Sequence, residues 1–163
     1  MHRYLLAFEI KTVDVGSSYA SLPLHCTLVH WFHSRQSPAE ILEVVQPILS
    51  KTEPLMITSV APALFGPNNT IPVHAVERSQ PLIRLHTSVL EALNDEIASF
   101  TEPGFVGAGY RPHVTNKEVI LAPGKAAKVS HLYCAEKIDA ANERVSHIHW
   151  KTALGTNIKP SDT

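Results

Sequence analysis

The stretches LHCTLV (residues 24–29) and PHVTN (residues 112–116) each place a histidine two residues before a threonine. Both lie in apolar, β-branched runs, which predict strands. Side chains at positions i and i+2 of a strand point to the same face of a sheet, so the histidine and threonine of each stretch are expected to share a face. The two histidines are 113 − 25 = 88 positions apart, so one lies in each half of the 163-residue chain.

Four side chains are therefore candidates to meet in one groove: His25 and Thr27 from the first stretch, and His113 and Thr115 from the second. A histidine pair supplies both a general base and a general acid near neutral pH. Threonine hydroxyls donate hydrogen bonds to the non-bridging oxygens of a phosphate in its transition state. These residue types predict phosphodiester chemistry that needs neither a metal ion nor a cofactor.

The composition predicts a globular protein with one domain or two small lobes that share a core, because 44% of the residues are hydrophobic and 18% are charged. The net charge of −1 argues against a large basic surface that wraps duplex nucleic acid. Cys26 and Cys134 have no metal-type spacing and are interpreted as reduced thiols of an intracellular protein. No apolar run approaches the ~20 residues of a membrane helix, and nothing resembles a signal peptide, so we expect a cytoplasmic location.

Hydrophobic periodicity predicts strand pairs that alternate with single helices. The expected strands cover residues 3–10, 22–32, 55–65, 71–76, 113–121, 129–138 and 145–154, and the expected helices cover residues 38–49 and 79–99. The first helix has the clearest start, since Ser37, Pro38 and Glu40 form a capping box with proline in the first turn. This order favours an α+β domain of antiparallel sheets with helices on their outer faces. Residues 1–155 are expected to form this single domain, and residues 156–163 a loose C-terminal tail.

The two motifs resemble those of the two-histidine phosphoesterases, the superfamily of the bacterial 2′-5′ RNA ligases and cyclic phosphodiesterases. The resemblance spans roughly residues 3–155 and implies two pseudo-symmetric lobes with the active-site groove between them. It implies that His25 and His113 are catalytic and that Thr27 and Thr115 hold the phosphate. It also implies hydrolysis of 2′,3′-cyclic phosphates or of 2′-5′-linked nucleotides, with RNA ends, cyclic nucleotides or cyclic oligonucleotides as substrates.

Several residues near the motifs are candidates for supporting roles. Tyr110 and Arg111 precede the second motif and are expected to contact base and phosphate of a substrate. The glycine-rich loop at 104–109 is expected to form a lip on the groove. His86, on the apolar side of the second helix, is expected to be buried and hydrogen-bonded. If the strand of the first motif is regular, His33 shares the face of the first motif and His30 does not.

Two other interpretations remain open. His147 and His149 share one strand face and, with another histidine, would suit a metal hydrolase. A non-catalytic RNA- or nucleotide-binding module would keep the groove without turnover. No obligate protein partner and no membrane association are indicated.

Overall fold

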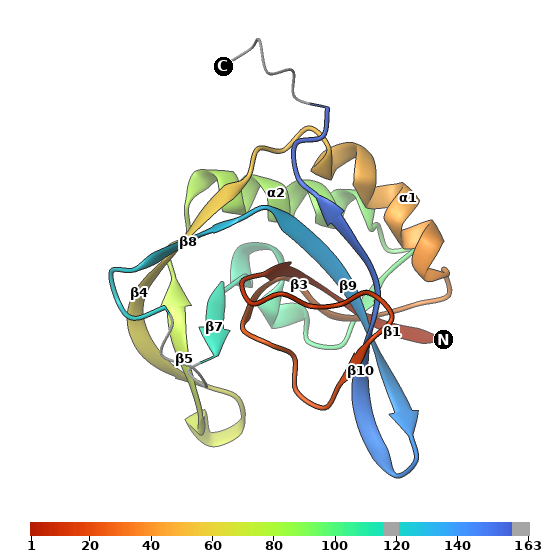
Figure 1. The fold of residues 1–163 in the computed structure, drawn as a ribbon, viewed down its shortest axis with the longest axis horizontal. Helices are drawn as coiled ribbons and strands as arrows, with labels where there is room; N and C mark the ends of the chain where they lie inside the picture. Colours follow the sequence, from red (N-terminus) through yellow and green to blue (C-terminus); the bar gives the residue numbers. More distant parts are fainter. Residues whose placement is uncertain (116–120, 158–163) are drawn as a thin grey trace.

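The computed structural model of the 163-residue chain describes residues 1–115 and 121–157. It contains two α-helices in this part of the chain, α1 (Pro38–Leu49) and α2 (Gln80–Ala92). The strands there are β1 (His2–Glu9), β2 (Ser18–Tyr19), β3 (His25–Ser34), β4 (Leu55–Phe65), β5 (Ile71–Val76), β6 (Ser99–Phe100), β7 (His113–Thr115), β8 (Ala126–Val129), β9 (His131–Ala140) and β10 (Glu143–Ala153). The α+β class predicted from the sequence is confirmed (Figure 1).

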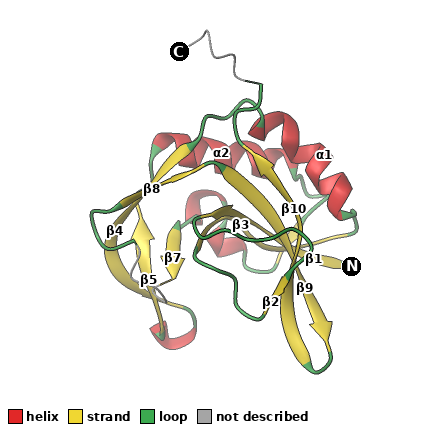
Figure 2. Ribbon diagram, viewed as in Figure 1, coloured by secondary structure: helices red, strands yellow, loops and turns green. Residues whose placement is uncertain are grey.

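The strands form one continuous antiparallel sheet in the order β2-β10-β9-β1-β3-β7-β5-β4-β8, with β6 paired to β3. Its two halves meet where β3 pairs with β7, at the single bridge between Cys26 and Val114. The two predicted sheets are therefore two halves of one sheet, and each half contributes one motif strand to the junction. Figure 2 shows the β4–β5–β8 half on the left and the β1–β9–β10 half on the right.

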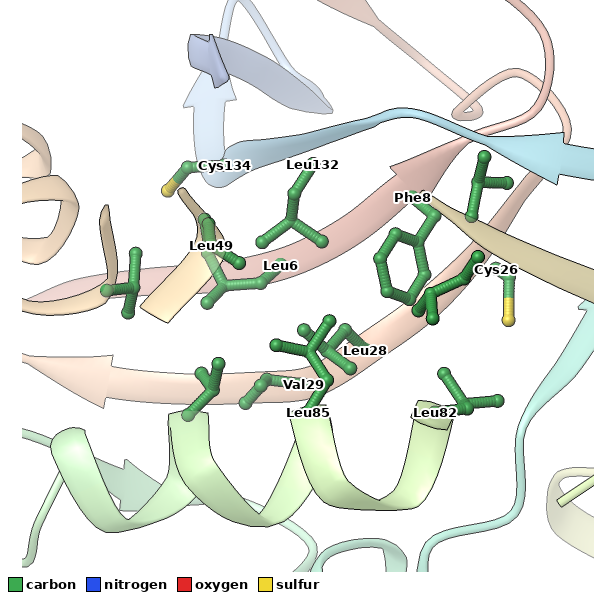
Figure 3. Close-up of a cluster of buried hydrophobic side chains, with 14 of the residues drawn as sticks. Leu6, Phe8, Cys26, Leu28, Val29, Leu49, Leu82, Leu85, Leu132 and Cys134 are labelled. Carbon is green, nitrogen blue, oxygen red and sulfur yellow. The ribbon is translucent and has the colours of Figure 1, made fainter. Parts of the chain in front are cut away.

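Both helices pack against the same face of the sheet and enclose the main core. Leu49 of α1 and Leu82 and Leu85 of α2 contact a cluster that includes Leu6 and Leu28 from the central strands (Figure 3). The opposite face carries a smaller apolar cluster of Leu5, Ala7, Val13, Tyr133, Ala135 and Ile148. A fully buried leucine contributes roughly 1.5–3 kcal/mol, so the helix-covered face provides most of the stability.

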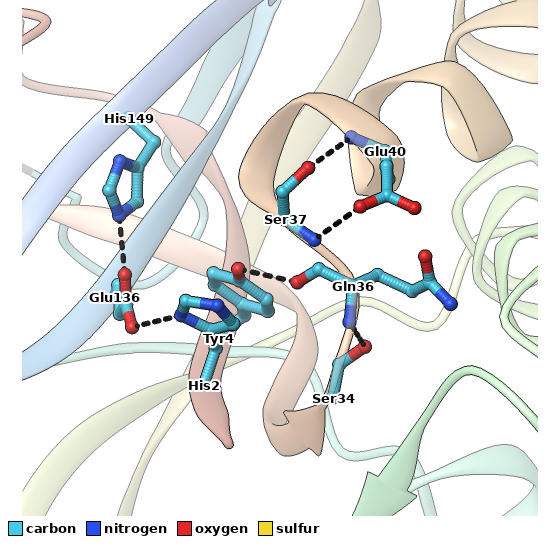
Figure 4. A network of polar contacts seen from close by, with 8 residues as sticks. All are labelled: His2, Tyr4, Ser34, Gln36, Ser37, Glu40, Glu136 and His149. Atoms are coloured by element: carbon cyan, nitrogen blue, oxygen red, sulfur yellow. Dashed lines mark hydrogen bonds and ion pairs between the residues drawn. The ribbon is translucent and has the colours of Figure 1, made fainter.

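The start of α1 agrees with the sequence prediction. The backbone N–H of Glu40 donates to the Ser37 hydroxyl oxygen (3.2 Å), and the Glu40 carboxylate accepts from the Ser37 N–H (3.1 Å). This reciprocal pair satisfies two N–H groups that have no partner within the helix. Figure 4 shows the capping box beside Gln36, whose carbonyl accepts a hydrogen bond from the Tyr4 hydroxyl.

The second helix ends earlier than predicted, at Ala92 instead of near residue 99. Leu93 leaves the helical conformation, and the carbonyl of Asn94 accepts hydrogen bonds from the N–H groups of Ile97 and Ala98. The Asn94 side chain accepts another from the Glu96 N–H. Asparagine favours such local bonds over a continuing helix, which explains the early end.

Two further differences concern strands. Residues 11–20, between the first two predicted strands, contain the short edge strand β2. The predicted strand at 129–138 is divided at Ser130, because β8 pairs with β4 in one half of the sheet and β9 pairs with β1 in the other. Ser130 is thus the point at which the chain crosses between the halves.

Parts of two predictions lie outside the described residues, namely the extension of β7 through 116–120 and most of the tail, 158–163. Among the described residues at this end of the chain, the N–H groups of Gly155 and Asn157 donate to the carbonyls of Leu49 and Ser50 at the end of α1. Cys26 and Cys134 are both buried and free, and burial raises the pKa of the Cys26 thiol to about 12. None of the helices in the described ranges combines the length and apolar character that crossing a membrane requires.

Candidate functional site

A pocket of about 220 Å³ opens at the junction of the two halves of the sheet. It lies on the face opposite the helices, and both motifs contribute to it through Thr27 and His113. The other lining residues are His30 of β3, Phe65 of β4, Gly66, Ile71 and Val73 of the β4–β5 hairpin, and Phe105, Tyr110 and Arg111 of the segment before β7. The wall is therefore mainly apolar, with imidazoles, a hydroxyl and a guanidinium as its polar groups.

Strand register explains why the two motifs meet. Because β3 and β7 are antiparallel and Cys26 pairs with Val114, Thr27 lies opposite His113 and His25 lies opposite Thr115. Side chains directly opposite each other share a face, with Cβ atoms about 4.5–5.5 Å apart, and diagonal neighbours lie ~7–8 Å apart. His25 and His113 are diagonal neighbours in this register, on one face of the sheet and with no layer of core between them.

The two histidines are held in the same way. The Nδ1–H of His25 donates to the carbonyl oxygen of Pro23, and that of His113 donates to the carbonyl oxygen of Arg111, both at 2.8 Å. In each case the acceptor is two residues earlier in the chain. A hydrogen bond from Nδ1 fixes the tautomer and the orientation of a neutral imidazole. Each motif therefore holds its imidazole in a defined orientation.

The surroundings of His113 keep its imidazole neutral at pH 7. Burial against the pocket wall lowers its pKa from the usual 6.5, the hydrogen bond to the Arg111 carbonyl opposes this, and the Arg111 charge lowers the pKa further. The ring of Phe65 lies 4.4 Å from the His113 ring, centroid to centroid. The Arg111 guanidinium lies 4.2 Å from the centre of the Phe65 ring, on the side of the pocket.

His25 is half-buried on the face it shares with Thr27 and is not among the described residues that line the pocket. The backbone of Thr115 pairs with Val73 of β5. The side chain of Thr115 lies outside what the structure describes, so its predicted phosphate contact stays a prediction.

The expectation that His30 points away from the face of the first motif is wrong, because β3 is not regular. Relative to β1, β3 carries extra residues between Thr27 and Val29 and again between Val29 and Phe32. A bulge reverses the alternation of side chains that follow it. His30 consequently lies in the pocket beside Thr27, with its ring 5.4 Å from that of Phe105.

His30 is a pocket residue that the sequence analysis placed on the wrong face. Its Nδ1 is buried and has no hydrogen-bond partner among the described residues. Burial is the main cause of its lowered pKa, partly offset by Glu102. Leu28 and Val29 are consecutive in β3 and both are buried. Two consecutive apolar residues interrupt the alternation of a strand, and this is the sequence signal that could have indicated a bulge.

Tyr110 and His86 form a stacked pair behind the pocket. Their rings lie 3.9 Å apart with an interplanar angle of 10°, and the Tyr110 hydroxyl donates to the Thr27 carbonyl (2.7 Å). The Nδ1–H of His86 donates to the Leu28 carbonyl (2.8 Å), and its Nε2 accepts from the Gly107 N–H (2.9 Å).

The prediction that His86 is buried and hydrogen-bonded is confirmed. Through these bonds it joins the bulge of β3 to the glycine-rich loop that precedes the second motif. Tyr110 is itself fixed from a third side, because Arg78 donates to its backbone carbonyl. The two residues predicted to contact a ligand thus differ, since Arg111 is exposed at the pocket and Tyr110 is buried in its wall.

The histidines of the alternative metal site are hydrogen-bonded elsewhere. His149 Nε2–H donates to one carboxylate oxygen of Glu136 (2.6 Å), and His2 Nδ1–H donates to the other (2.8 Å), as Figure 4 shows. His147 Nδ1 lies 2.8 Å from the Ser18 hydroxyl. No group of three or more potential metal ligands occurs within residues 1–115 and 121–157. The contact between the Glu136 carboxylate and His149 could not be predicted from the local sequence. It depends on a bulge in β10 and on the pairing of β10 with β9.

An antiparallel α+β sheet with one His-x-Thr motif on each side of a central junction defines the architecture of a two-histidine phosphoesterase. The model of the 2′-5′ RNA ligase superfamily matches residues 8–150, and the chain belongs to this superfamily. A comparison with curated proteins finds no match.

Solved structures share the fold at low sequence identity. TT0787 of Thermus thermophilus is 14% identical with a TM-score of 0.64, over 94% of this chain and 98% of that one. A crystal structure described as a phosphoesterase has a TM-score of 0.59 at 14% identity, with the same coverage. LigT of E. coli in complex with 3′-AMP has a TM-score of 0.58 at 14% identity, again over 94% and 98% of the two chains.

Proposed function

We propose that this protein is a metal-independent phosphoesterase that hydrolyses 2′,3′-cyclic phosphates or 2′-5′-linked or cyclic oligonucleotides. The observation that carries the proposal is the matched pair of histidines on adjacent strands, each held through Nδ1 by the carbonyl two residues earlier, with His113 in the wall of the pocket. Further support comes from the superfamily and from the LigT of E. coli, which has been crystallised with phosphate and with 3′-AMP.

In the proposed reaction, one histidine activates water and the other protonates the leaving oxygen. His113 suits the base, because its lowered pKa keeps Nε2 unprotonated at neutral pH. It takes a proton from water while the water oxygen forms a bond to phosphorus. The bond from phosphorus to the 2′ or 3′ oxygen breaks, and His25 gives that oxygen a proton. The cycle closes when the proton passes from His113 back to His25 through solvent.

The remaining pocket residues would bind and orient the phosphate. The hydroxyls of Thr27 and Thr115 are proposed to donate to the non-bridging oxygens, where negative charge collects in the transition state. Arg111 is proposed to attract the anion from the exposed rim of the pocket. Tyr110, whose hydroxyl supports the Thr27 carbonyl, would hold the first motif in position and form part of the wall that a base contacts.

The test is hydrolysis of 2′,3′-cyclic mononucleotides and cyclic oligonucleotides by purified protein in EDTA. We expect turnover that EDTA does not abolish, and a fall of about 10²–10⁴-fold in His25→Ala and in His113→Ala. The matched control is His147→Ala, which removes a histidine hydrogen-bonded to Ser18 outside the pocket.

Three outcomes would contradict the proposal. Loss of activity in EDTA would favour the metal hydrolase, particularly if His147→Ala were also inactive. Full activity in either motif variant would exclude the histidine pair. Nucleotide binding without turnover, retained in both variants, would favour the non-catalytic binding module.

A further inference from the structure

A second depression on the protein is lined mainly by basic side chains. It has a volume of about 180 Å³ and is formed by Met1, Arg3, His33, Lys137, Asp139 and Arg144. These residues come from the ends of β1, β3, β9 and β10, in the half of the sheet that carries the first motif. Such a concentration of cations is unexpected in a chain whose net charge is −1.

The positive charge of the depression is only partly neutralised by the protein. Its one lining carboxylate among the described residues, Asp139, is paired with Arg144 (3.0 Å). The Nε of Arg3 is buried and has no hydrogen-bond partner in the described parts of the chain. Leaving a buried guanidinium N–H unpaired is costly, and an incoming anion would remove that cost.

Trp31 contacts two of these cations. The Arg3 guanidinium lies 5.4 Å from the centre of the Trp31 ring, and the Lys137 ammonium lies 4.8 Å from it. Both cations are therefore within cation–π range of one ring. Burial lowers the pKa of Lys137, and the charges of Arg3 and Arg144 lower it further, which indicates that the cations are close enough to repel one another.

The depression lies on the same strand and the same side of the sheet as the candidate pocket. Trp31 packs on the apolar cluster opposite the helices, and the Cα of His33 pairs with that of Arg3. His30 lines the pocket and is three residues from His33, about 10 Å along a strand. His30 also lies within electrostatic reach of both Arg3 and His113, so it stands between the two sites.

The pocket itself is small for an oligonucleotide. Its volume of about 220 Å³ lies below the ~300–1,000 Å³ common for sites that enclose a whole drug-sized ligand. It suits the reacting phosphate and part of one nucleoside, and any longer substrate must continue outside it. Along β3 that continuation leads to the basic depression.

We propose that Arg3, Lys137 and His33 form a second phosphate subsite, which binds a backbone phosphodiester of an oligonucleotide whose reacting phosphate occupies the pocket. The inference rests on the proposed function and refines it, because it names oligonucleotides as the preferred substrates over mononucleotides. Arg3 supplies a guanidinium whose Nε has no partner in the described residues, Lys137 adds a flexible charge, and Trp31 contacts both.

The experiment compares a 2′,3′-cyclic mononucleotide with a short RNA that ends in a 2′,3′-cyclic phosphate. In Arg3→Gln and Lys137→Gln we expect KM for the RNA to rise about tenfold, as loss of a charged hydrogen bond implies, with KM for the mononucleotide changed less than about twofold. The control is Lys51→Gln, which removes an exposed lysine just after α1, on the helix-covered side. Equal effects on both substrates, or none on the RNA, would overturn the subsite.

A binding measurement separates this proposal from the proposed function. Fluorescence anisotropy of a fluorescein-labelled RNA with a 3′-phosphate end requires no turnover. We expect weaker binding in both subsite variants and a salt dependence whose slope falls by roughly 0.7 for each phosphate contact removed. Weaker binding in a protein that hydrolyses nothing would keep the subsite and reject the enzyme. Absent binding, or binding that both variants retain, would reject the subsite even if the mononucleotide is hydrolysed.

Discussion

The two motif strands differ in the support that is described for them, yet they orient their histidines identically. β3 pairs with β1 along most of its ten residues, whereas the three described residues of β7 lie between β3 and β5. In both, the imidazole Nδ1–H donates to the carbonyl two residues earlier. The turn into each strand therefore sets the orientation of the ring, and the length of the strand does not.

The surroundings of the two histidines are where the motifs diverge. His113 lines the pocket and packs against Phe65, and burial lowers its pKa, whereas His25 is not among the described lining residues. Imidazoles that the backbone holds in the same way can take different roles according to what packs around them. The proposal that His113 is the base rests on this difference.

The largest effect is expected when both imidazoles are removed. His25→Ala/His113→Ala should lower kcat/KM about as much as either single variant, ~10²–10⁴-fold, because groups that act in one transition state are not additive. Steady-state kinetics on one cyclic substrate measures all three variants. If the double variant instead shows the product of the two single losses, the histidines act independently and the proposed pairing is wrong.

A large loss of stability is expected when the connection between the two motifs is removed. His86→Ala leaves the Leu28 carbonyl and the Gly107 N–H without their partner and removes the stack on Tyr110, which should lower the free energy of unfolding by about 2–4 kcal/mol. Urea denaturation measures this loss, with Thr87→Ala at the exposed neighbouring position as the control. Equal stability of the two variants would show that His86 does not support the site.

A moderate shift in pH dependence should follow from opening the wall around His113. Phe65→Ala lessens the burial that lowers the His113 pKa, so this pKa should rise toward its usual value of 6.5. Because the base is active when unprotonated, the acid limb of kcat/KM should move to higher pH. NMR titration of the His113 ring checks the pKa directly, with Leu64→Ala as an exposed control on the same strand.

The same titration has a stability consequence with a defined sign. The unfolded chain protonates His113 at a higher pH than the folded chain does, so its contribution to stability is lost as the pH falls below about 6.5. Phe65→Ala should reduce that pH dependence. A His113 pKa that stays unchanged or moves down in the variant would contradict the role assigned to burial.

The smallest effect is expected far from the pocket, at Glu136. Burial raises the pKa of this carboxyl, but its hydrogen bonds with His2 and His149 outweigh burial and lower it overall. Its contribution is therefore present above about pH 4.5 and is lost as the pH falls through the lowered pKa. Glu136→Gln should cost about 1 kcal/mol at neutral pH and leave kcat/KM unchanged.

Urea denaturation at neutral pH and again in acid, at about pH 3, checks the Glu136 prediction. The difference in stability between the wild type and Glu136→Gln should be present at neutral pH and should shrink in acid. A difference that grows in acid would mean that the carboxylate is not the stabilising form. A loss of activity would show that this cluster is coupled to the pocket.

Local features of the chain were predictable from neighbouring residues. The capping box of Ser37 and Glu40 needs only four consecutive residues, and the shared face of His25 and Thr27 needs only the alternation of a strand. The buried position of His86 follows from the apolar stripe of α2. Each of these features depends on residues that are close together in the chain, so the local sequence is enough to predict it.

The features that complete the site depend on pairing between distant segments. The bulges of β3 exist relative to β1, and they turn His30 into the pocket. The carboxylate of Glu136 reaches His149 only through the register of β9 with β10. A one-residue change of register moves a side chain to the other face, and register is set by the partner strand as well as by the strand's own residues. The amino-acid order thus specified two oriented His-x-Thr motifs, and the packing of the two half-sheets determined which other groups surround them.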